Sequence, residues 1–183
     1  MTILRSSLLV LASALVYYLI FTINRFVFQS LEFSFGVNWI FIPSGVQFLL
    51  VLIAVWQGAL GIVLASFIIG LENYYLDSVV STFITALISG FSPLLARKIC
   101  FDFLKIEKDL LNITRKCILQ MSFVFAIVSA SLHQIWFFYN EKSEAFIQSL
   151  FVMAVGNLLG TTLVLGTIRL IQFNFQNDKS SRE

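Results

Sequence analysis

The sequence has very few charged residues. Only 12% of its 183 residues are charged, whereas 58% are hydrophobic and the mean hydropathy is +0.90. A soluble domain carries about 25% charged residues, so water is not the solvent of most of this surface. The twelve Lys and Arg nearly balance the ten Asp and Glu. Nucleic acid is therefore excluded as a partner, because it would need a concentrated basic face.

Cysteine and histidine are also scarce. Cys100 and Cys117 do not form a Cys-x-x-Cys pair, and His133 is the sole histidine. Metal sites and disulfide frameworks need several such residues at close spacing. We therefore expect no metal, no cofactor and two reduced thiols.

Charged side chains are missing from the interior of every apolar run. A charge at membrane depth costs about 2.5 to 3.5 kcal/mol and persists where function requires it. The sequence also has no carboxylate pair, no Ser-His-Asp arrangement and no phosphate-cradling glycine loop. We expect a protein that is neither an enzyme nor an ion pump.

The sequence is rich in uncharged apolar runs. A membrane-spanning helix needs roughly 20 apolar residues. The expected fold class is all-α, a polytopic membrane protein with a bundle of about six transmembrane helices. A single integral membrane domain would cover residues 1–172, and 173–183 would form a short polar cytoplasmic tail. The expected spans are 6–24, 38–55, 58–71, 78–96, 117–140 and 145–168.

The run from Phe33 to Leu71 is too long for a single crossing. As one helix it would extend about 58 Å, nearly twice the hydrocarbon thickness. The centre of the run, Trp56-Gln57-Gly58, is typical of a tight turn at the headgroup level, which predicts two helices. Since the second helix is short, a re-entrant pair is the alternative.

The distribution of Lys and Arg predicts orientation. The loop 97–116 carries six of these residues and the loop 72–77 carries none. Because such residues stay on the cytoplasmic side, we expect a multi-pass protein of the plasma (inner) membrane with a cytoplasmic C-terminus. Five and six crossings both give ten basic residues inside and two outside, so the side of the N-terminus stays open.

A few polar residues within the spans are candidates for a ligand pocket. A buried amide needs partners, so Gln47 and Asn157 must bond across helices or line a polar cavity. The backbone groups near Pro43 that lack helical hydrogen bonds are further candidates. His133 has two interpretations, a ligand contact or a histidine bonded to a neighbouring helix, and the second is favoured. The ligand-binding candidates are Pro43, Ser44, Gly45, Gln47, His133 and Asn157.

Small residues predict close helix packing. Gly58 and Gly61 lie on one stripe of the third expected span. Gly156 and Gly160 have the Gly-x-x-x-Gly spacing that lets two helices approach closely.

Three stretches together resemble the first membrane-associated sensor domain family. They are Ile42-Pro43-Ser44-Gly45 with the run into Trp56-Gln57-Gly58, the basic end Leu94-Leu95-Ala96-Arg97-Lys98, and Val155-Gly156-Asn157-Leu158-Leu159-Gly160. The resemblance implies an integral membrane sensory module. Asn157 stands where that family has an acidic residue, and we expect a stand-alone copy of the module without an output domain.

Three functions are consistent with these patterns. The first is a non-catalytic, sensor-like or accessory module that binds a small ligand within the bundle. A separate signalling or transport protein would bind at the cytoplasmic loop 97–116, and the lipid bilayer would be the other partner. The second is a substrate-binding membrane subunit of an energy-coupling-factor importer, although Ala12 and Ala14 lack that family's Ala-x-x-x-Ala spacing. The third is a scaffold in a cell-envelope complex.

Overall fold

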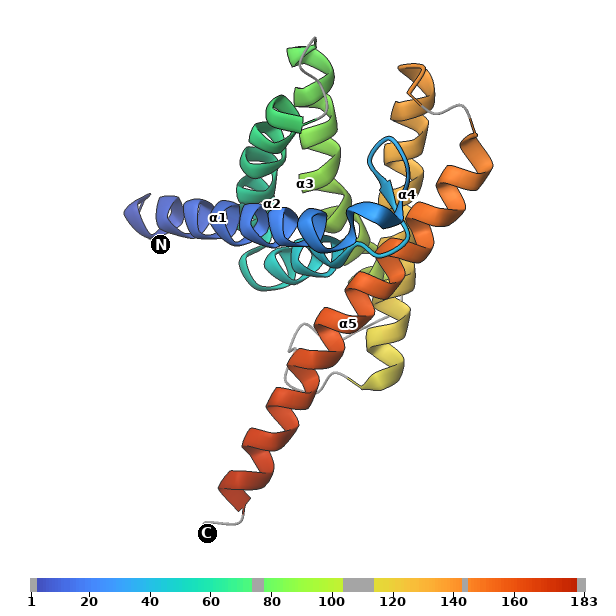
Figure 1. Ribbon diagram of the computed structural model, residues 1–183. Helices are drawn as coiled ribbons and strands as arrows, with labels where there is room; N and C mark the ends of the chain where they lie inside the picture. The colour runs from blue at the N-terminus through green and yellow to red at the C-terminus, as the bar shows by residue number, and fades with distance from the viewer. Residues whose placement is uncertain (1–2, 74–77, 104–113, 143–144, 181–183) are drawn as a thin grey trace.

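The computed structural model describes residues 3–73, 78–103, 114–142 and 145–180, with side chains in the last segment as far as Ile171. Within these residues the chain is helical apart from one short hairpin (Figure 1). The elements are α1 (Ile3–Phe28), η1 (Gln29–Leu31), β1 (Glu32–Ser34), β2 (Val37–Asn38), α2 (Ile42–Asn73), α3 (Val79–Asp102), α4 (Arg115–Tyr139) and α5 (Phe146–Ser180).

Five helices are long and apolar enough to cross a membrane. The all-α fold class is therefore confirmed, but the expected count of six is wrong. The two spans expected on either side of Trp56-Gln57-Gly58 belong to one element, α2, which is interrupted by a kink at Val55. The long apolar run is thus divided into two helical halves at Val55, directly before the expected break at Trp56-Gln57-Gly58.

The kink in α2 depends on one unusual residue and one glycine. Val55 has φ 43° and ψ −105°, a conformation that β-branched residues rarely adopt. Gly58 lies against the backbone carbonyl of Leu50 on the other side of the kink, where a Cβ would collide with it. Glycine therefore allows the two halves of α2 to fold closely toward each other.

Consecutive helices pack against one another, and α5 returns to pack against α2. In the view of Figure 1, α1 runs across the molecule, whereas α3 and α4 run up it. The C-terminal half of α5 projects beyond the other helices (Figure 1). Ser78 and Thr114 cap α3 and α4, since their hydroxyls accept from the backbone N–H of Ser81 and Cys117.

The buried apolar residues form three clusters. Ala14, Tyr17 and Phe21 of α1 pack on the α2 residues in the first cluster. The second joins α2 to α3, α4 and α5, and here Phe48 stacks on Phe125 with ring centroids 5.0 Å apart. The third cluster packs the hairpin on α4 and α5, with the residues Val37, Ala130, Phe137, Val152 and Met153. Polar side chains lie between the first and third clusters.

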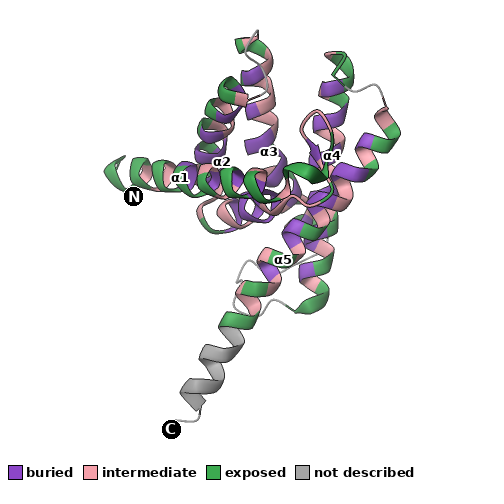
Figure 2. Cartoon of the chain, in the orientation of Figure 1, coloured by how far each residue is buried: buried purple, intermediate pink, exposed green. Residues whose placement is uncertain are grey.

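Apolar side chains also cover the outside of the bundle. Figure 2 shows that most of α1 is exposed, including Leu8, Leu11, Leu15 and Leu19. A soluble monomer rarely exposes such a continuous apolar patch. Lipid is the solvent that this surface suits.

The N-terminal segment of α2 and the helix α5 meet backbone to backbone. Gly156 lies against the carbonyl of Asn38, and Gly160 lies against the carbonyl of Phe41. Gly45 in turn lies against the carbonyl of Gly160. We call this set the glycine contact. A Cβ at any of the three positions would overlap main-chain atoms.

Replacing Gly160 with Ala should destabilise the fold by about 1–3 kcal/mol, because the methyl group overpacks the contact with Phe41. Gly166 on the same helix is the matched control, since a Cβ there meets nothing within 4 Å. Gly166→Ala should be neutral or stabilising by about 0.5–1 kcal/mol. Unfolding of the detergent-solubilised protein measures both. Equal stability of the two variants would contradict the glycine contact.

Candidate functional site: an uncharged polar cavity

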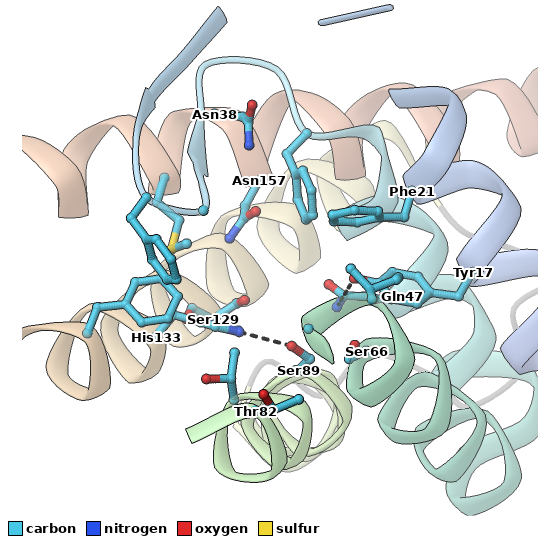
Figure 3. A pocket seen from close by; sticks show the side chains of 18 residues that line it. Tyr17, Phe21, Asn38, Gln47, Ser66, Thr82, Ser89, Ser129, His133 and Asn157 are labelled. Carbon is cyan, nitrogen blue, oxygen red and sulfur yellow. Dashed lines mark hydrogen bonds between the residues drawn. The ribbon is translucent and has the colours of Figure 1, made fainter. Parts of the chain in front are cut away.

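A cavity of about 80 Å³ lies inside the bundle, between the α1–α2 cluster and the cluster of the hairpin with α4 and α5 (Figure 3). Every helix contributes to its wall. The lining residues are Tyr17, Phe21, Phe35, Gly36, Asn38, Phe41, Gln47, Ser66, Ile69, Gly70, Thr82, Thr85, Ser89, Ser129, His133, Phe137, Met153 and Asn157.

The wall of the cavity combines aromatic rings with neutral polar groups. Its hydroxyls and amides come from Tyr, Ser, Thr, Asn and Gln, and His133 supplies the one imidazole. None of these described lining residues is Asp, Glu, Lys, Arg or Cys. The cavity therefore offers hydrogen bonds without a formal charge, which suits a neutral occupant.

Gln47 and Tyr17 form one wall. The Gln47 Nε2 donates to the Tyr17 hydroxyl at 2.9 Å, which ties α2 to α1 (Figure 3). Gln47 is buried, so this bond satisfies an amide that would otherwise be costly at that depth. The residue lies four positions beyond Pro43, on the segment of α2 that precedes the kink.

His133 forms the opposite wall and bonds to a neighbouring helix. The Nδ1 lies 2.8 Å from the carbonyl oxygen of Ser129, and the Nε2 lies 3.1 Å from the Ser89 hydroxyl of α3. A carbonyl can only accept, so we assign the proton of the neutral ring to Nδ1. Ser89 then donates to Nε2. Both ring nitrogens are satisfied without a charge on the imidazole.

Two polar groups of the cavity have no protein partner. The Ser66 hydroxyl is buried and makes no hydrogen bond with the described residues. Asn157 is only 3% exposed, and its backbone carbonyl accepts from the Thr161 hydroxyl and lies 3.0 Å from the Ser44 hydroxyl. Its side-chain amide makes no bond within the described part of the chain and lies beside the cavity (Figure 3). A polar group that faces a cavity without a protein partner is stabilised when water or a ligand bonds to it.

The β1–β2 hairpin covers one side of the cavity. Its turn contains Gly36 at φ 65°, and a Cβ there would meet the Phe137 ring at 3.5 Å. Ser34 is 3.1 Å from Ser149 of α5, hydroxyl to hydroxyl, and the Lys142 ammonium lies 5.6 Å from the centre of the Phe35 ring. These contacts fix the hairpin over α4 and α5.

The structure brings together three of the residues that the sequence proposed for a pocket. Gln47, His133 and Asn157 all line the cavity, although α2, α4 and α5 are far apart in the sequence. The other three, Pro43, Ser44 and Gly45, are buried and do not line the cavity.

The Ser44 side chain does not line the cavity and contacts backbone carbonyls instead. Its hydroxyl donates to the Phe41 carbonyl at 2.7 Å and lies 3.0 Å from the Asn157 carbonyl. Gly45 belongs to the glycine contact. Ser44 and Gly45 thus hold the first turn of α2 on α5, and in doing so they position Asn157.

The glycines proposed for helix packing all lie at close approaches. The Cβ position of Gly61 is 2.6 Å from the Cβ of Ser13 on α1. Gly156 and Gly160 form the glycine contact with the entry to α2, and Gly58 lies at the kink described above.

Most of the remaining lining residues were not foreseen. Tyr17, Ser66, Thr82 and Ser89 are small or amphipathic side chains within strongly apolar helices. A membrane helix is apolar on all sides, so its pattern does not indicate which face points inward. The spacing of Thr82, Ser89 and Gly90 on α3 was the one available signal.

The geometry limits the chemistry of the cavity. Within the described residues, no three His, Cys, Asp or Glu side chains lie close enough to hold a metal ion. A cavity of about 80 Å³ is roughly half the size of the ~150 Å³ cavity that admits benzene, while one water needs about 10–15 Å³. The cavity therefore has room for several waters or a very small polar molecule.

No protein-family model, no curated protein and no solved structure matches this chain. Its class is thus defined by the fold and the cavity. It is an all-α chain with five helices suited to crossing a membrane and a neutral polar cavity among them.

Replacing Ser89 with Ala should destabilise the protein by about 1–3 kcal/mol, because the Nε2 of His133 would be left buried and unpaired. Ser92 is the matched control on the same helix, since it is fully buried and its hydroxyl has no partner among the described residues. Ser92→Ala should cost less than about 1 kcal/mol or stabilise the fold. Denaturant titration in detergent compares the two, and a larger cost at Ser92 would contradict the bond.

Proposed function

We propose that this chain is a non-catalytic, sensor-like membrane module that binds a very small neutral molecule in the central cavity. The observations that carry the proposal are two polar groups on the cavity wall: the Ser66 hydroxyl, which is buried without a partner in the described residues, and the Asn157 amide, which makes no hydrogen bond to them. A group so placed is stabilised by an occupant that accepts and donates hydrogen bonds.

The chemistry of the wall supports binding over catalysis. His133 supplies the one imidazole among the described lining residues, and both its nitrogens are engaged. A general base must reach the proton that it removes, whereas this ring already bonds to Ser89 and Ser129. A ligand would therefore be held and released unchanged.

The helices that line the cavity connect it to the rest of the molecule, so binding would change their packing. An occupant would contact all five helices, so their relative packing would depend on it. From Asn157 to Ser180, α5 is one continuous helix of roughly 35 Å. A small rotation at the cavity would move the far end of α5, which is where a partner would respond.

The resemblance to the first membrane-associated sensor domain family agrees with this proposal and stays a prediction. The region of the resemblance around Gly156 to Gly160 holds the unpaired amide, and its region around Pro43 holds α2 on α5. The vitamin-importer alternative is less favoured, because pockets for such ligands measure about 300–1,000 Å³, well above 80 Å³. The proposed partner surface, loop 97–116, includes residues 104–113, which lie outside the described part of the chain.

Replacing Asn157 with Leu should leave membrane insertion intact and abolish stabilisation by the ligand. We would screen the detergent-purified protein by thermal shift against small neutral metabolites such as urea, glycerol and short amides. Mass spectrometry of the released fraction would identify any molecule retained through purification. A reproducible shift in the wild type that vanishes in Asn157→Leu supports the site.

Two serine variants control this experiment. Ser66 and Ser122 each have a buried hydroxyl without a partner among the described residues, but only Ser66 lines the cavity. Ser66→Ala should weaken the ligand-induced shift, whereas Ser122→Ala should leave it unchanged. Ligand stabilisation that survives in Asn157→Leu and Ser66→Ala would refute binding in this cavity.

The charges at the two ends of the bundle support a cytoplasmic C-terminus. Arg97 and Lys98 lie near the end of α3, Arg115 and Lys116 lie at the start of α4, and Arg169 lies near the end of the apolar part of α5. The opposite end is marked by the contacts between Ser81 and Asn140 and between Lys142 and Phe35.

We propose that the basic end faces the cytoplasm. A fluorescent protein that folds only in the cytoplasm, fused after Glu183, should fluoresce, and alkaline phosphatase at that position should be inactive. The reverse pattern would overturn this orientation.

A further inference from the structure

A second hollow lies at the basic end of the bundle, away from the central cavity. It measures about 410 Å³ and is formed between the first turns of α4 and the second half of α5. Figure 1 shows the two helices diverging there. We call it the α4–α5 groove, and its lining residues are Arg115, Ile118, Leu119, Thr162, Leu163, Gly166, Thr167, Arg169 and Leu170.

Positive charge is concentrated at one end of the α4–α5 groove. Arg115 is the first residue of α4 and Arg169 lies near the end of the apolar part of α5. The N-terminus of a helix carries a partial positive charge, yet the first turn of α4 has no acidic residue and holds Arg115 and Lys116 instead. This arrangement favours an anion supplied from outside the helix.

The deeper part of the groove is apolar. Leu163 is six residues before Arg169 on α5, and Leu119 is four residues after Arg115 on α4. At 1.5 Å per residue they lie roughly 9 Å and 6 Å further into the span. Gly166 has nothing within 4 Å of its Cβ position, so the groove is open at its middle. Charged and apolar surface thus follow each other along the membrane normal.

We propose that the α4–α5 groove binds an anionic phospholipid. Arg115 and Arg169 hold the phosphate at the headgroup level, since guanidinium groups donate paired hydrogen bonds to phosphate oxygens. One acyl chain lies on Leu119 and Leu163, with Gly166 providing the space. The site is independent of the central cavity and of the ligand proposed for it.

Native mass spectrometry of the detergent-purified chain tests this proposal. Phosphatidylglycerol and phosphatidylcholine with identical acyl chains would be titrated in turn. Phosphatidylglycerol should bind the wild type in preference, at one saturable site. Arg115→Gln and Arg169→Gln should each weaken that binding roughly fivefold to tenfold. Equal binding of the two lipids would overturn the proposal.

Lys116→Gln is the matched control, because Lys116 is exposed, adjoins Arg115 and does not line the groove. It removes the same charge and should change the affinity less than twofold. A loss equal to that of Arg115→Gln would mean that diffuse charge attracts the lipid, which contradicts a built site.

Gly166→Leu separates the acyl-chain contact from the charge. It should fill the groove and weaken phosphatidylglycerol binding while both arginines remain. Its thermal unfolding without lipid should match that of the wild type, since a Cβ meets no neighbour there. Retained lipid binding in this folded variant would overturn the groove assignment. Inorganic phosphate that competes as strongly as the whole lipid would overturn the lipid assignment in favour of a free anion.

Discussion

The structure depends on the glycine contact between α5 and the segment that enters α2. Residues 39–41 are non-helical within the bundle, and membrane-embedded backbone needs partners inside the protein. Gly156 and Gly160 let α5 approach this segment, so that the Phe41 N–H donates to the Gly156 carbonyl at 3.4 Å. From the other side, Asn24 of α1 accepts from the Ile42 N–H at 3.0 Å and donates to the Ile40 carbonyl at 3.5 Å. The irregular segment is thereby satisfied between two helices.

This contact also creates the cavity. It fixes the rotation of α5, which turns Asn157 toward the interior, and it holds the hairpin above α4. The same helix continues to the α4–α5 groove, where Leu163 and Arg169 lie. A bound molecule and a bound lipid would both act on α5, at positions on opposite sides of its midpoint. This geometry links the two proposed sites through one rigid element.

Much of the fold followed from the sequence, but the inward faces did not. The lengths of the uncharged runs predicted the helices. The spacing of Gly156 and Gly160 predicted that α5 packs closely against another part of the chain. The break expected at Trp56-Gln57-Gly58 lies one residue earlier, at Val55, the residue of α2 with non-helical φ and ψ. The hairpin was missed although Phe33, Phe35 and Val37 alternate around Gly36, a strand-and-turn pattern. Pro43 and Gly45 are buried away from the cavity. The sequence did not show this, because no periodicity distinguishes the faces of a wholly apolar helix.

The most direct test of the account is an experimental structure of the protein in a lipid nanodisc, at a resolution that shows ordered water. The account predicts density in the cavity within hydrogen-bonding distance of the Asn157 amide and the Ser66 hydroxyl. This density would be a small molecule, or a cluster of waters at the position proposed for that molecule. An empty cavity, or an Asn157 amide turned away to bond another protein group, would contradict the account.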